Sequence, residues 1–85
     1  MTQPGVPERD LLVGHFVRER RRIAGLTQRE LADLAGVGKR FVVELEGGKQ
    51  TLRLDKVNQV LRAFGKHLGP VDLPRDARGI TTQDG

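Results

Sequence analysis

Apolar residues recur at helical spacing along most of the chain. The first run begins near Asp10, a residue type suited to an N-cap, and extends to Ala24, with Gly25 as the stop. Its apolar positions are Leu12, Val13, Phe16, Val17, Ile23 and Ala24. This spacing predicts a helix over residues 10–24.

A second, shorter helix is predicted from Thr27 to Gly36. Thr27 is a good N-cap and Glu30 stands three residues later, which is the capping-box pattern, while Leu26 is placed to staple the entry. The residues that this helix is expected to bury are Leu31, Ala32 and Ala35.

Two further helices are predicted downstream. One runs from about Gly38 to Glu46 and is followed by Gly47-Gly48, where a left-handed terminator fits. The other spans 54–64 and is followed by Gly65. It places four apolar residues on one stripe: Leu54, Val57, Leu61 and Phe64.

The remaining segments lack a helical pattern. Residues 1–9 are expected to form a flexible arm, and the polar residues 75–85 a disordered tail. Residues 67–74 contain two prolines, so they can form at best a short edge strand.

Four short helices with connections of about two to six residues predict an all-α domain over residues 10–66. The second and third helices are joined by only Gly36-Val37-Gly38, which is typical of a helix-turn-helix. Isolated helices of this length are marginal in water, so the two must support each other by packing.

The helix over 38–46 has two different faces. Val42 and Leu45 point inward, whereas the opposite arc carries Lys39, Arg40, Val43 and Glu44. The helix dipole disfavours each cation on the first turn by roughly 0.3–1 kcal/mol. Binding of an external polyanion would make the placement of these cations favourable.

These four residues are candidate contacts to DNA bases, because the first turn of a helix in the major groove reaches the base edges. Lysine and arginine can pair with guanine, and Val43 would suit a thymine methyl group. Glu44 could accept from cytosine or pair with Arg40 one turn back. A solvated surface face, without DNA, is the alternative left open.

Candidate contacts to the DNA backbone surround this helix. Gln28 lies beside the free N–H groups that open the second helix, where a phosphate docks readily, although glutamine is also an ordinary early-helix residue. Basic residues Arg18, Arg20, Arg22 and Arg29 could form a rim, or could serve solubility alone. The predicted backbone contacts are Gln28, Gly38, Arg20, Arg22, Arg29 and Lys49.

Glu46 stands at the C-terminal end of a helix, where negative charge is disfavoured. It therefore calls for a dedicated cation, and Arg21 on the first helix can supply one. We interpret this pair as structural, with a solvent-exposed Glu46 as the alternative.

The composition of the chain limits the classes of partner that we expect it to bind. The chain has 85 residues, a net charge of +4, 36% hydrophobic residues and no Trp or Tyr. So few hydrophobic residues favour a hydrophobic core that is shared between two chains, as in a homodimer. The positive charge favours acidic partners such as nucleic acid. There is no cysteine, no apolar run that could span a membrane and no signal-peptide pattern, so we expect a cytoplasmic, nucleoid-associated protein.

Enzyme chemistry has little support in the sequence. His15 and His67 lie far apart, and the stretch 36–39 lacks the spacing of a phosphate-binding loop. No cluster has metal-ligand spacing. We therefore expect neither enzyme activity nor a cofactor or metal.

The motifs together resemble the Xre/phage-repressor helix-turn-helix family over about residues 11–66. The matching residues are Gly25-Leu26-Thr27-Gln28, Glu30-Leu31-Ala32, Ala35-Gly36-Val37, Val42, Leu45-Glu46 and Gly48-Lys49. The resemblance implies a lambda-repressor-like domain of four to five helices, with 38–46 as the recognition helix. It also implies a backbone contact by Gln28 and an internal salt bridge between Arg21 and Glu46.

A narrower resemblance is to HipB-type antitoxins, through "VRERRRIAGLTQ", "KRFVVELEGGK" and "LRLDKVNQVLRAFG". It implies a dimeric autorepressor that also binds a HipA-type Ser/Thr kinase toxin, with a strand at 67–74 paired to its twin. The dimer contacts expected here are Val60, Phe64, Leu68, Val71 and Leu73. Pro70 departs from the HipB-type pattern, because it removes a backbone donor from the strand. Gly38 departs from the wider Xre/phage-repressor family, which usually has Ser or Thr as this cap.

The sequence thus predicts a sequence-specific repressor that binds a palindromic operator as a homodimer, with half-site centres about 34–36 Å apart or a multiple of that. Two alternatives stay open: a stand-alone Xre-family regulator without a toxin, and a protein-interaction module with little DNA binding.

Overall fold

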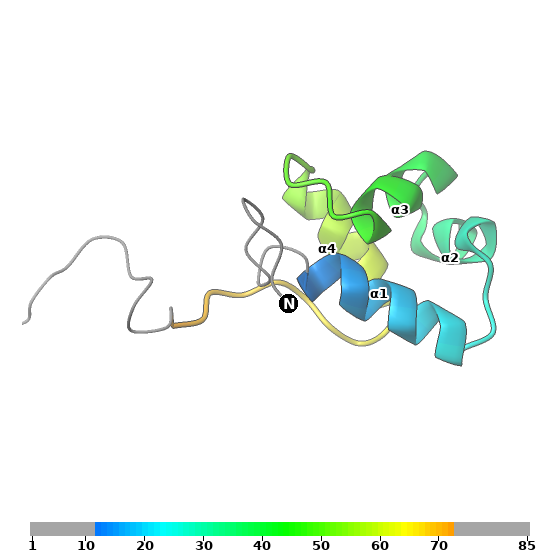
Figure 1. Cartoon of the computed structure of the whole chain (residues 1–85), viewed down its shortest axis with the longest axis horizontal. Helices are drawn as coiled ribbons and strands as arrows, with labels where there is room; N and C mark the ends of the chain where they lie inside the picture. Colours follow the sequence, from blue (N-terminus) through cyan, green and yellow to red (C-terminus); the bar gives the residue numbers. More distant parts are fainter. Residues whose placement is uncertain (1–11, 73–85) are drawn as a thin grey trace, which may run out of the picture.

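The helices of the structure begin and end close to the boundaries predicted from the sequence. The computed structural model describes residues 12–72 and contains α1 (Leu12–Ile23), α2 (Gln28–Ala35), α3 (Lys39–Glu46) and α4 (Leu54–Arg62) (Figure 1). No strand occurs within this range, which confirms the all-α class. The predicted N-terminal arm and C-terminal tail, together with Asp10 and Leu73, lie outside the described residues.

The caps of α2 have the predicted form. The Thr27 hydroxyl accepts from the Glu30 N–H at 3.0 Å, and the Glu30 carboxylate accepts from the Thr27 N–H at 2.8 Å. At the other end Gly36 is left-handed, with φ of 75°, which lets the chain leave the helix without a Cβ clash. The capping box and the glycine stop are therefore both confirmed.

α4 is two residues shorter than predicted. The N–H groups of Ala63 and Phe64 bond to carbonyls three residues earlier instead of four, so the last turn tightens and leaves the α-helix. Left-handed Gly65 then reverses the chain.

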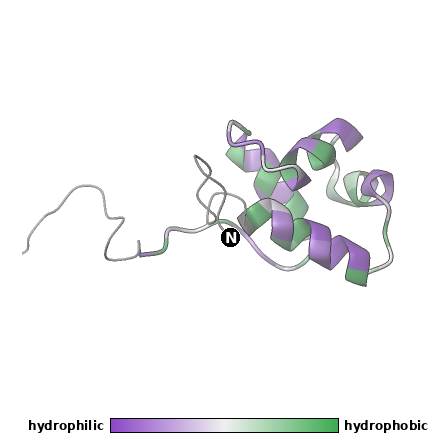
Figure 2. Ribbon diagram, in the orientation of Figure 1, coloured by the Kyte–Doolittle hydropathy of each residue, from purple (hydrophilic) through white to green (hydrophobic). Residues whose placement is uncertain are grey.

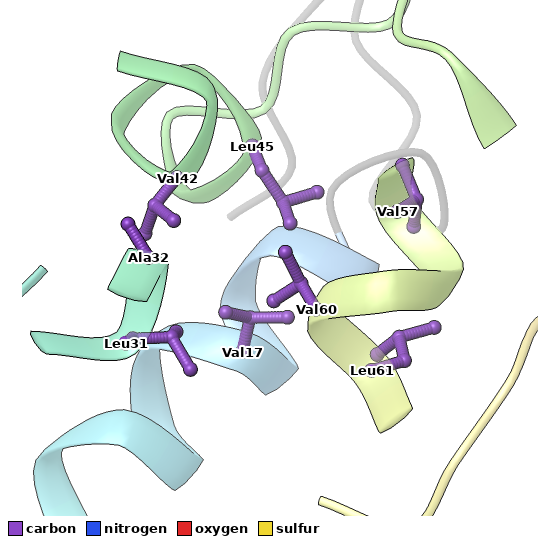
Figure 3. Packing of buried hydrophobic residues seen from close by; sticks show 8 residues of the cluster. All are labelled: Val17, Leu31, Ala32, Val42, Leu45, Val57, Val60 and Leu61. Atoms are coloured by element: carbon purple, nitrogen blue, oxygen red, sulfur yellow. The ribbon is translucent and has the colours of Figure 1, made fainter. Parts of the chain in front are cut away.

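Side chains from all four helices meet in one core (Figure 3). The buried residues are Val17, Leu31, Ala32, Val42, Leu45, Val57, Val60 and Leu61. Around them pack partly buried side chains, including Phe16 and Phe64, whose rings meet edge to face with centroids 6.4 Å apart. The inward positions predicted for α2 and α3 are confirmed, except that Ala35 is only partly buried.

Two apolar predictions need correction, and a third apolar residue is exposed. Val60 has no exposed surface within one chain, so it belongs to the core and has nothing to offer a second copy. Leu54, predicted to lie on the apolar stripe of this helix, is the first residue of α4 and is 68% exposed. It lines a groove together with Val13 and Val57. Ile23, at the last position of α1, is 76% exposed.

After Gly65 the chain returns alongside α4. The Leu68 N–H donates to the Asn58 side-chain oxygen at 2.7 Å, and Leu68 packs against the core. Residues 67–72 form no strand within the single chain. None of the helices between residues 12 and 72 is long and apolar enough to cross a bilayer.

Gly14 allows α1 and α3 to lie against each other. It is buried, and a Cβ built on it would collide with the main-chain carbonyl oxygen of Leu45. Any other residue here would push the two helices apart, because a main-chain atom cannot turn aside as a flexible side chain does.

We therefore predict that Gly14→Ala destabilises the domain by about 1–3 kcal/mol, the usual effect of overpacking. Helix propensity alone predicts the opposite sign, since alanine is favoured over glycine by about 1 kcal/mol in a helix. Urea unfolding measures the difference. Gly69→Ala is the matched control, because nothing lies within 4 Å of its Cβ and its φ is not positive. Equal stability of the two variants would contradict this close approach.

Candidate nucleic-acid interface

The turn between α2 and α3 presents the start of α3 to solvent. Left-handed Gly36 and extended Gly38 bracket a partly buried Val37, and the two helices pack on each other (Figure 1). In Figure 2 the first turn of α3 is hydrophilic on the outside of the molecule, while the apolar side of the helix turns toward the core. The three-residue connection has thus produced the expected helix-turn-helix.

Lys39 and Arg40 both point away from the body of the protein. Arg40 has a side chain that is 90% exposed, and Lys39 is exposed as well. Val42 and Leu45, on the other side of α3, are buried. The two cations therefore stand at the positive end of a helix, as the sequence pattern indicated, and no element between residues 12 and 72 covers them.

Glu44 pairs with two cations. One of its oxygens lies 3.5 Å from the Arg40 Nε, one helical turn back, and the other lies 3.6 Å from the Lys49 Nζ. Of the two roles open to Glu44 from the sequence, the free protein shows the ion pair with Arg40. Val43 is the exposed apolar residue beside this group.

Glu46 joins three helices. Arg21 from α1 donates to it twice, from Nε at 2.7 Å and from Nη2 at 3.0 Å, and Gln28 from α2 donates at 3.2 Å. The third guanidinium nitrogen of Arg21, Nη1, donates to the Leu26 carbonyl at 2.8 Å. The hydrogen bond that Arg21 donates to Glu46 raises the pKa of Arg21 and outweighs the opposing effect of burial, so the pairing favours the charged guanidinium.

Gln28 is therefore partly committed within the protein. Its amide nitrogen carries two N–H groups, and one is directed to Glu46. The second N–H group makes no hydrogen bond within the described residues. Gln28 is also the first residue of α2, so the free N–H groups of that helix lie next to it.

The arginines of α1 do not form one rim. Arg20 lies over the Phe16 ring at 5.3 Å, on the side of α1 that meets Phe64. Since a helix turns about 100° per residue, Arg20 points about 200° away from both Arg18 and Arg22. Arg20 therefore points away from Arg22, the other backbone contact predicted on α1.

Two further predicted backbone contacts, Arg29 and Lys49, are exposed. Arg29 lies on the first turn of α2, and Lys49 lies just after α3. Gly38 is the N-cap of α3 and makes no side-chain cap bond.

Sequence reasoning missed Arg53 and Lys56. Both line a surface hollow next to α3, together with Arg40, Glu44 and Lys49. Arg53 pairs with Asp55 at 2.7 Å, and this hydrogen bond lowers the pKa of the Asp55 carboxyl. Arg53 stands at the N-cap of α4, a position that disfavours cations just as the start of α3 does, so the same dipole argument could have found it.

The described part of the chain offers no group of three or more His, Cys, Asp or Glu side chains that could hold a metal ion. Its distinctive chemistry is the basic surface around α3.

Comparisons with known proteins agree with this geometry. Residues 12–72 match the model of a helix-turn-helix domain. The chain is 51% identical over 53 residues to an uncharacterised HTH-type transcriptional regulator, y4mF, of Sinorhizobium fredii (strain NBRC 101917 / NGR234), covering 62% of this chain and 70% of that protein. A solved toxin–antitoxin module from Streptococcus pneumoniae superposes with a TM-score of 0.66 at 30% identity, covering 79% of this chain and 74% of that one. The chain therefore belongs to the Xre-like helix-turn-helix family of DNA-binding transcriptional regulators.

Proposed function

We propose that the protein is a sequence-specific repressor that inserts α3 into the major groove, with Lys39 and Arg40 reading bases. The observation that carries this proposal is the outward placement of both cations on the first turn of a helix whose opposite side is buried. In the free protein the dipole opposes both cations, and Glu44 partly offsets this at Arg40. An external anion would make both placements favourable. Val43 lies on the same exposed arc and would meet a thymine methyl group.

Contacts to phosphates would supply most of the affinity. Gln28 and Arg29 open α2, Gly38 opens α3, and Lys49 follows α3, so they border the recognition helix. Arg53 and Lys56 extend this basic border along the hollow beside α3. Arg22 is exposed on α1 and would make a more distant phosphate contact. Binding should accordingly weaken steeply as salt rises.

Two substitutions separate base reading from backbone contact. Arg40→Ala should lose about 1–3 kcal/mol of discrimination at the base pair that it reads and so relax sequence preference. Arg29→Ala should weaken binding to all sequences alike and reduce the salt slope by about one. The measurement is a titration against the promoter of the protein's own gene and against altered promoters, at several salt concentrations. Unchanged affinity and preference in Arg40→Ala would show that α3 is not the recognition helix.

We further propose that two copies bind a palindromic operator in the cytoplasm. The dimer contact would lie where Phe64, Leu68 and Val71 meet α1, with Leu73 continuing the segment. Val71 is 87% exposed beside Val13 and Phe16. This surface is formed by α1 and by the chain after α4. A dimer contact there therefore does not involve Lys39 or Arg40 on α3.

Val71→Asp should therefore disrupt the dimer without disturbing the core. An unpaired charge in an apolar contact is costly, so the dimer dissociation constant should rise at least about tenfold and operator affinity should fall with it. Light scattering after size exclusion, at micromolar concentration, reports the mass. Leu34→Asp is the matched control, because Leu34 is an exposed leucine on α2. A dimer that survives Val71→Asp would place the contact elsewhere.

The similarity to a toxin–antitoxin module favours an antitoxin over a stand-alone regulator. With the HipB-like motifs around α1, α3 and α4, we infer that the partner is a HipA-type Ser/Thr kinase encoded next to this gene. Expression of a tagged chain from its native locus should therefore co-purify the kinase. A neighbouring gene of another class, or none, would leave a stand-alone autorepressor. A chain that binds the kinase but lacks salt-dependent DNA affinity would be an interaction module.

A further inference from the structure

Glu44 is an acidic side chain on the outward arc of α3, between residues proposed to meet a polyanion. Left alone, a carboxylate there would repel DNA phosphates. It is not alone, because Arg40 lies on one side of it at 3.5 Å and Lys49 on the other at 3.6 Å. Each carboxylate oxygen takes one cation, so the group is a bridge between two basic side chains.

The bridge uses one particular atom of Arg40. Glu44 lies against the Nε of the guanidinium, so the Nη1 and Nη2 end is left for another partner. Two parallel N–H groups are what a bidentate contact with guanine requires. The side chain of Arg40 is also 90% exposed, so without Glu44 nothing in the described chain would set its direction.

We propose that Glu44 is a positioning residue that aims Arg40 at the base edge and joins it to the phosphate contact at Lys49, and is not itself a base contact. This rests on the proposed function of sequence-specific DNA binding. It also explains why an acidic residue is tolerated on this arc, since its charge is balanced by two neighbours before DNA arrives.

Such a role predicts two opposite effects of removing the charge. Exposed ion pairs are individually weak, so Glu44→Gln should reduce discrimination at the Arg40 base pair by only about two- to five-fold. The same change removes one negative charge that faces the phosphates, so affinity for unrelated DNA should rise and the salt slope should steepen. A residue that serves folding alone would produce neither pattern.

The test is a double-mutant cycle on the full chain. Dissociation constants are measured for the operator and for operators altered at each G·C pair, using the wild type, Glu44→Gln, Arg40→Ala and the double variant. Positioning predicts that Glu44→Gln loses discrimination at the pair read by Arg40, and that it has no further effect on discrimination once Arg40 is alanine. Glu19→Gln, an exposed glutamate on α1, is the control for net charge.

Three results would overturn the proposal. Lost discrimination at a different base pair, persisting in the Arg40→Ala background, would make Glu44 a direct base contact. Identical behaviour of Glu44→Gln and Glu19→Gln would make the bridge inert while leaving sequence-specific binding intact. A wild type without sequence preference would remove both this role and the proposed function.

Discussion

The burial of Val42 and Leu45 fixes the rotation of α3, and the outward surface depends on that rotation. Full burial of an aliphatic side chain of this size stabilises by about 1.5–3 kcal/mol. The two cations at the start of the helix each oppose folding by only about 0.3–1 kcal/mol. The burial of Val42 and Leu45 therefore outweighs the dipole penalty, and Lys39 and Arg40 are held where the helix dipole alone would not place them.

A polar contact secures the other end of α3. Glu46 receives donors from Arg21 and Gln28, so α1, α2 and α3 are tied at one carboxylate. Burial of a charge is tolerable only when its hydrogen bonds are satisfied, and here each Glu46 oxygen has a donor. Because Gln28 opens α2, the same contact fixes where the free N–H groups of that helix lie relative to α3. The burial of Val42 and Leu45 sets the rotation of α3, and the hydrogen bond between Gln28 and Glu46 holds α3 against α2.

Sequence patterns predicted the features that depend on neighbours along one helix. The capping box at Thr27 and the inward pair on α3 are of this kind, because three- and four-residue spacing determines both. Features that depend on how helices cross were not predictable. The contact of Gly14 with the Leu45 carbonyl, the complete burial of Val60 and the stacking of Arg20 on Phe16 all require knowledge of which helix faces which. Amphipathic spacing identifies a buried side, but it does not identify the partner.

Charge placement around α3 extends the same reasoning beyond one helix. Arg40 at the start of α3 and Arg53 at the N-cap of α4 occupy positions that favour anions, and both line one surface hollow. The described acidic residues of this region, Glu44 and Asp55, are each paired with a cation there. The free domain thus keeps its basic surface locally balanced and at a small cost in stability. Phosphates arriving at both helix starts would meet exposed N–H groups and positive side chains together, so the sign of each unfavourable placement would reverse on binding.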